Sequence, residues 1–163
     1  MTKTLAIFAA LACLAQAGAA RNACEVLTKK DLAAVQGESF KSTKLTQSSD
    51  ATLVHSQCFY ELPTFPKSVS VVIMTPAPGA EPMRSYWKRH FEEARSEEGE
   101  EETVRVRGVG DEAVWSGNHL VGSLYILRRN AILRLSVGGP GTKEQKIAKA
   151  KRLGLRALAR LSG

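Results

Sequence analysis

Residues 53–75 read LVHSQCFYELPTFPKSVSVVIMT and hold two stretches in which apolar and polar side chains alternate. The first covers residues 53–62, where Cys58 and Tyr60 share one side, and the second covers residues 68–75. Successive side chains of a strand point to opposite faces, so this period predicts two strands with one face in a core. The prolines between the two stretches predict a connecting loop.

Further strand-like segments lie on either side of this pair. One precedes it and is polar and weak, and the others fall in the second half of the chain, where short runs of β-formers recur between turn signals. The predicted segments are residues 40–47, 102–107, a short piece around 113–115, and a hairpin of 119–127 and 131–137 that turns at 128–130.

Three helices are predicted from their end signals and their apolar spacing. The helix over residues 29–36 has Thr28 as its N-cap and Asp31 at its third position, where a carboxylate suits the helix dipole. The other two helices cover residues 81–98 and 142–161, in which apolar side chains recur at three- and four-residue steps.

If the short piece around residues 113–115 is left out, these elements follow one another in the order α-β-β-β-α-β-β-β-α. Runs of strands separated by helices predict an α+β fold, in which helices pack on an antiparallel sheet. The chain after residue 20 is long enough to enclose a real core. We therefore expect one α+β domain over residues 21–163.

The first twenty residues have the parts of an export signal. Lys3 provides a positive start, residues 5–14 form an apolar run, and small residues crowd positions 15–20. This pattern predicts a signal peptide over residues 1–20 and a periplasmic or secreted protein. The run is shorter than the roughly 20 apolar residues that span a bilayer, and no later segment approaches that length, so no transmembrane span is expected.

Cys13 leaves a second interpretation of this segment open. Leu11-Ala12-Cys13 resembles part of a lipobox, the signal for lipid attachment at a cysteine. It departs from that pattern because Ala10 stands where leucine is usual and the apolar run continues past Cys13. Lipidation at Cys13 would tether the protein to a membrane.

Two cysteines, Cys24 and Cys58, remain after cleavage. In an oxidising compartment two thiols without another partner most simply pair, so we expect a structural disulfide between them. A redox-active thiol would instead require a C-x-x-C pair or an activating neighbour, and the sequence has neither.

Several short motifs resemble a known pattern. They are CEVLTKKD at residues 24–31, Gly37, CFY at residues 58–60 and GVGDEA at residues 108–113. In these motifs the chain is similar to bacterial exported proteins and lipoproteins that share no established activity, and in layout it resembles the Mog1/PsbP-like α/β/α sandwiches. The resemblance implies a fold and an exported location, and it implies no catalytic residue.

No constellation in the sequence predicts catalysis, a metal site or a cofactor. The GVGDE loop at residues 108–112 places two carboxylates side by side, which could bind a cation or act as acid or base. Adjacent side chains diverge, however, so we favour a turn in which the glycines permit a positive φ and Asp111 bonds nearby backbone groups. His55, His90 and His119 lie on separate predicted elements without the spacing of a zinc site.

The final predicted helix carries a basic stripe, which we define as Lys149, Arg152, Arg156 and Arg160. Its apolar side chains share another face. A basic amphipathic helix can bind an anionic partner, or it can simply hold its charges in water, and both interpretations stay open. Aromatic residues do not alternate with the basic ones, so nucleic acid is not an expected partner.

These observations favour an exported, non-enzymatic domain that binds an envelope partner or an anionic surface, with the basic stripe as the binding residues. The formal net charge of +7, which falls to +6 without Lys3, favours weak attraction to anionic surfaces. Two alternatives stay open: a hydrolase whose site is assembled from dispersed residues, and an inhibitor of a hydrolase. The sequence indicates no oligomeric state.

Overall fold

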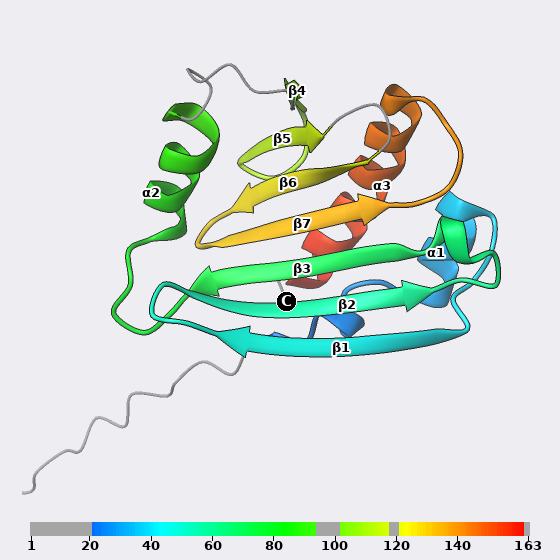
Figure 1. Cartoon of the computed structure of the whole chain (residues 1–163), viewed down its shortest axis with the longest axis horizontal. Coiled ribbons are helices and arrows are strands. Elements are labelled where there is room, and N and C mark those ends of the chain that lie inside the picture. Colours follow the sequence, from blue (N-terminus) through cyan, green and yellow to red (C-terminus); the bar gives the residue numbers. More distant parts are fainter. Residues whose placement is uncertain (1–20, 94–101, 118–120, 162–163) are drawn as a thin grey trace, which may run out of the picture.

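The structure is a computed structural model that describes residues 21–93, 102–117 and 121–161. Within these residues seven strands form one antiparallel sheet, in the order β1-β2-β3-β7-β6-β5-β4 (Figure 1). The predicted α+β class with an antiparallel sheet is therefore confirmed. The strands are β1 (Ser42–Ser49), β2 (Leu53–Glu61), β3 (Val69–Pro76), β4 (Glu102–Arg105), β5 (Glu112–Gly117), β6 (Gly122–Arg128) and β7 (Ala131–Val137).

The second run of strands has one member more than the predicted order. The short piece around residues 113–115 is the centre of β5, which pairs with β4 on one side and with β6 on the other. Ala113, Val114 and Trp115 are all buried, so each face of β5 lies under a packed layer. Alternation is hard to see in a strand that is covered on both faces.

Helix α1 (Lys29–Gln36) has the predicted bounds and the predicted cap. The backbone N–H of Asp31 donates to the Thr28 hydroxyl, and the backbone N–H of Thr28 donates to the Asp31 carboxylate. This reciprocal arrangement satisfies two N–H groups that the start of a helix otherwise leaves without partners. Gly37 then ends the helix with a left-handed φ of 82°.

The other two helices begin close to where the sequence places them. Helix α2 (Met83–Trp87) continues as one turn of π-helix, η3 (Lys88–Glu93), and the remainder of the predicted helix lies outside the described residues. Helix α3 (Lys143–Leu161) is preceded by Thr142, whose hydroxyl accepts from the backbone N–H of Gln145. Among the described residues, no helix is long and apolar enough to cross a membrane.

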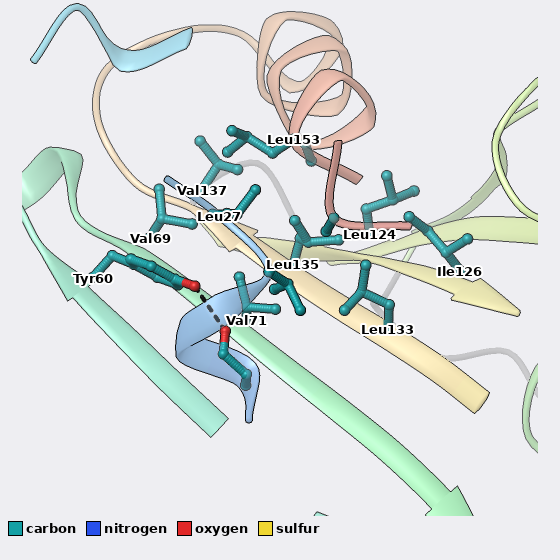
Figure 2. Close-up of a cluster of buried hydrophobic side chains, with 14 of the residues drawn as sticks. Leu27, Tyr60, Val69, Val71, Leu124, Ile126, Leu133, Leu135, Val137 and Leu153 are labelled. Carbon is teal, nitrogen blue, oxygen red and sulfur yellow. Dashed lines mark hydrogen bonds between the residues drawn. The ribbon is translucent and has the colours of Figure 1, made fainter. Parts of the chain in front are cut away.

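One face of the sheet is covered by α1 and α3. Most side chains of β3 and β7 that point to this face are buried, as are Leu153 and Ala157 of α3. Figure 2 shows this cluster, in which the buried Tyr60 hydroxyl donates to the Ala23 carbonyl oxygen at 2.7 Å. That hydrogen bond ties the segment before α1 to the middle of the core, where an unpaired hydroxyl would be costly.

The other face of the sheet carries α2 over only part of its area. Met83 and Trp87 pack on Val72, Ile132 and neighbouring side chains near the β6–β7 turn. Figure 1 shows α2 at this end of the sheet, whereas α1 lies near the opposite end. The strands beyond α2 therefore expose part of their second face.

A disulfide joins Cys24 to Cys58, with 5.0 Å between the two Cα atoms. Cys24 belongs to a short 3₁₀ turn, η1 (Ala23–Glu25), and Cys58 points into the core from β2. The predicted pairing is therefore confirmed, and it clamps the entry to α1 onto the sheet. Residues 1–20, where the export signal and Cys13 lie, are outside the described residues.

Candidate functional site

Four serines from four neighbouring strands lie in one row on the face that carries α2. Ser70 of β3 is paired in register with Ser136 of β7, and Ser123 of β6 is paired with Ser116 of β5. The row is continuous between these pairs, because the hydroxyl oxygens of Ser123 and Ser136 lie 2.6 Å apart. We call Ser70, Ser136, Ser123 and Ser116 the serine row.

The strand period explains why these hydroxyls face away from the main core. In β3, Val69 and Val71 point toward α1 and α3, so Ser70 between them points to the opposite face. All four serines are half-buried rather than freely exposed. Neighbouring strands are about 4.8 Å apart, so the row spans roughly 14 Å across the sheet.

Larger side chains stand on both sides of this row and make it the floor of a groove. Phe59 of β2 is paired in register with Ser70, and Tyr125 lies two residues beyond Ser123 on the same face. The ring of Phe65 packs against Phe59, with 5.9 Å between the ring centroids. The groove between these walls has a volume of about 540 Å³.

The lining of this groove is rich in hydroxyls and nearly without charge. Among the described residues that line it, Lys146 of α3 is the sole charged side chain, and none is a histidine or a carboxylate. Each serine hydroxyl offers one donor and two acceptor positions, so the row can exchange hydrogen bonds with a ligand that has both. Gln57 adds a weak internal contact, donating to the Ser70 hydroxyl at 3.4 Å.

The basic stripe of α3 is turned largely toward α1. Arg152 donates to the Ala34 carbonyl oxygen at 3.1 Å, and Arg160 donates to the Val26 carbonyl oxygen at 3.0 Å. Such bonds satisfy main-chain oxygens of α1 and of the segment just before it. Arg156 and Arg160 also form ion pairs with the Asp31 carboxylate of α1, and Lys149 is half-buried. The structure thus gives the three arginines an intramolecular role, and partner binding by the stripe stays a prediction.

The Asp31 carboxylate forms ion pairs with both Arg156 and Arg160. Its Oδ1 lies 3.2 Å from Arg156 and its Oδ2 lies 2.8 Å from Arg160. Burial raises the pKa of Asp31, but the hydrogen bonds from Thr28 and the charge of Arg160 outweigh that effect and hold this pKa below its ordinary value. Asp31 therefore stays ionised and acts as a structural anchor.

The GVGDE loop has a structural role. The Asp111 carboxylate accepts from the backbone N–H of Arg129 at 2.6 Å and from the Arg128 guanidinium at 2.8 Å. Glu112 likewise pairs with Arg84 at 2.7 Å. The loop is the turn that we predicted, with a left-handed φ of 65° at Gly110, but the backbone group that Asp111 binds lies in the distant β6–β7 turn.

The histidines described by the structure lie on separate elements. His55 is half-buried on β2, and the exposed His90 stacks on Tyr86 with 3.8 Å between the ring centroids. His119 lies outside the described residues. No group of three or more His, Cys, Asp or Glu side chains in the described part of the chain could hold a metal ion.

Sequence reasoning missed the serine row, although a signal is present. Ser70 and Ser123 are each the second residue of their strand, whereas Ser116 and Ser136 are each the last but one. In antiparallel neighbours the second position of one strand lies near the penultimate position of the next, so this placement allows a row. The row becomes visible only when the strand order is known.

No protein-family model, curated protein or solved structure matches this chain. The resemblance to the Mog1/PsbP-like sandwiches therefore stays a prediction. The structure defines the protein as an α+β domain with a disulfide between Cys24 and Cys58. A groove with a floor of serines lies on the face of its sheet that α2 covers only in part.

Proposed function

We propose that this protein is an exported, non-enzymatic binding domain whose groove binds an oligosaccharide of the cell envelope. The observation that carries the proposal is the serine row, which places four hydroxyls side by side on four neighbouring strands, near one end of those strands. A row that repeats with the strand spacing suits a ligand that repeats its own hydroxyl groups.

The walls of the groove favour a sugar over a strongly charged ligand. Sugar rings have apolar C–H faces as well as polar edges, and the rings of Phe59 and Tyr125 offer apolar surface beside the hydroxyl floor. A pocket of this size with aromatic walls and a few convergent polar groups is typical of small-ligand sites.

The chemistry of the lining supports binding rather than hydrolysis. Glycoside hydrolysis normally uses two carboxylic residues on either side of the scissile bond. The described residues that line the groove include no carboxylate, and the carboxylates of Asp111 and Glu112 are engaged in ion pairs elsewhere. Among the described residues that line the groove, no histidine or carboxylate accompanies the serine hydroxyls as a general base, which supports binding of a sugar over activation of water.

The location in the envelope rests on the disulfide together with the signal-peptide pattern. Disulfides persist in oxidising compartments and are rare in the cytosol. An exported protein meets the glycans of the cell wall and outer surface, which supports an oligosaccharide as the partner.

The test uses chitotetraose, a soluble tetramer of an N-acetylated amino sugar, titrated into the protein in a calorimeter. We expect binding by the protein and a loss of at least tenfold in affinity for the double variant Ser70→Ala, Ser136→Ala and for Phe59→Ala. Ser85→Ala, an exposed serine of α2 outside the groove, is the matched control and should bind as before. A folded protein that binds neither chitotetraose nor isolated cell-wall glycan would overturn the proposal, and so would release of shorter sugars from chitotetraose.

A further inference from the structure

A second cavity lies on the opposite face of the sheet, at the C-terminal end of α3. It has a volume of about 280 Å³. Ile73 and Leu133 form its floor and Leu158 and Leu161 of α3 form one wall. Because Ile73 and Leu133 belong to the core between the sheet and α3, this pocket is separated from the serine row by the sheet itself.

Arginines surround this apolar pocket. Arg21, Arg128 and Arg129 all line it, and the described lining includes no carboxylate. Arg21 donates a hydrogen bond to the main-chain oxygen of Leu161, which holds its guanidinium beside the pocket. Arg128 is paired with Asp111 at 2.8 Å, whereas no described carboxylate pairs with the guanidinium of Arg129. An apolar interior beside a guanidinium that no described carboxylate neutralises is complementary to an anion that carries an alkyl chain.

Arg129 is also held in an uncommon backbone conformation. It is the one non-glycine residue with a positive φ in the described chain, at 53°, in the two-residue turn between β6 and β7. Left-handed backbone at a turn is the usual place for glycine. The turn is fixed from both sides, because the Arg129 N–H donates to Asp111 at 2.6 Å and the Asn130 side chain accepts from the Met83 N–H at 2.8 Å. Strain of this kind persists where the surroundings enforce it, and it is concentrated at functional sites.

We propose that this pocket binds a single-chain anionic amphiphile, with its alkyl chain over Ile73 and Leu133 and its anionic head group between Arg21 and Arg129. The enforced turn places the Arg129 guanidinium at the pocket mouth, where a glycine would satisfy the backbone but offer no charge. The same chemistry can come from a free fatty acid or from the lipids of an anionic membrane. The site is independent of the groove, so failure of the sugar experiment leaves it standing.

The test compares dodecanoate with its uncharged analogue dodecanol, using the mature protein as the cell processes it. Binding is measured by displacement of a fluorescent fatty acid. Arg129→Gly keeps the turn, because glycine accepts a positive φ, and removes only the guanidinium. We expect this variant to keep or raise the Tm of the protein and to bind dodecanoate at least tenfold more weakly, with dodecanol binding unchanged. Arg129→Lys should retain most of the affinity, and Arg105→Gln, an exposed arginine of β4 outside this pocket, should retain all of it.

Vesicles of phosphatidylglycerol distinguish the two sources. Arg129-dependent binding of both dodecanoate and vesicles supports the site with membrane lipid as the source, and binding of dodecanoate alone supports it with a free fatty acid. Three results would overturn the proposal: no binding of dodecanoate, equal affinity in Arg129→Gly, or binding of vesicles alone, which would reveal a flat membrane-contact surface instead of a pocket.

Discussion

Arg160, in the last turn of α3, holds its guanidinium 2.8 Å from the carboxylate of Asp31, in the first turn of α1. Only 9% of the Asp31 side chain is exposed, whereas 38% of the Arg160 side chain remains accessible. The pair therefore brings the two helices of one face together through a carboxylate that is nearly buried and a guanidinium that is partly exposed. The same carboxylate caps α1, so helix capping and helix packing depend on one residue.

The first prediction separates the members of the basic stripe. Arg156→Gln and Arg160→Gln should each lower the free energy of unfolding by about 1 kcal/mol, since partly exposed ion pairs and their hydrogen bonds contribute at this level. Lys149→Gln should change it by less than about 0.5 kcal/mol, as for ordinary surface substitutions. Urea unfolding measures all three. Equal effects at the three positions would contradict the inference that Arg156 and Arg160 hold α3 against α1.

A quadruple glutamine variant tests whether the basic stripe binds a partner. If the stripe binds an anionic partner, replacing Lys149, Arg152, Arg156 and Arg160 by glutamine should abolish capture of that partner while the fold survives. Binding should also weaken with salt, because exposed charges are screened over about 8–10 Å at physiological ionic strength. Undiminished, salt-independent capture by the folded quadruple variant would remove the stripe from the binding surfaces.

A second prediction concerns acid stability. The pKa of Asp31 is lower in the folded protein than its ordinary value of about 3.9, so the ionised form stabilises the fold. This contribution is fully present above the ordinary pKa and is lost as the pH falls through the lowered one. Asp31→Asn should therefore lose stability at pH 7 and lose less than the unchanged protein between pH 5 and pH 2. Parallel stability curves for the two proteins over that interval would refute the role of Asp31.

The third prediction concerns the disulfide between Cys24 and Cys58. A bond that closes a loop over 34 residues of sequence separation stabilises a fold by up to about 4 kcal/mol according to chain-entropy theory. Cys58→Ser should thus lower the urea midpoint strongly. Without reductant, the unfolded mature protein should take up no alkylating reagent, and with reductant it should take up two equivalents. Uptake of two equivalents before reduction would show that the thiols are free.

A fourth prediction uses two neighbouring leucines of α3. Leu153 is fully buried, whereas Leu155 is 47% exposed. Leu153→Ala should lower the free energy of unfolding by roughly 2–5 kcal/mol through lost burial and the cavity left behind. Leu155→Ala, the matched control, should cost less than about 0.5 kcal/mol. Thermal or urea unfolding of the two variants checks the orientation of the helix, and a larger loss for Leu155→Ala would contradict it.

The fifth prediction concerns processing at the N-terminus. The small residues that signal peptidase requires are concentrated just before residue 21, so the mature chain should begin between Gly18 and Ala23. Intact-mass measurement on the exported protein locates the cut. A mass that corresponds to a diacylated Cys13 at the N-terminus would instead identify a lipoprotein.

Local signals in the sequence were sufficient for most elements. Helix α1 has the predicted bounds because its cap, its third-position carboxylate and its terminal glycine lie within ten residues of one another. β2 and β3 were predictable because each has one buried face, and their alternation appears directly in the residues. The length of β5 was underestimated because both of its faces are covered, and a strand covered on both faces lacks the alternation of apolar and polar residues by which strands are recognised.

The class of fold, the element order up to one strand, and the pairing of the two remaining cysteines could therefore be inferred from residues close in the chain. The serine-floored groove, the cavity at the C-terminal end of α3 and the orientation of the basic stripe could not, because each depends on contacts between distant segments. The serine row requires the crossover that sets β7 between β3 and β6, and Arg160 reaches Asp31 only after α3 has packed beside α1. The sequence determines which chemical group each side chain carries, but the sheet register and the helix packing determine which side chains become its neighbours.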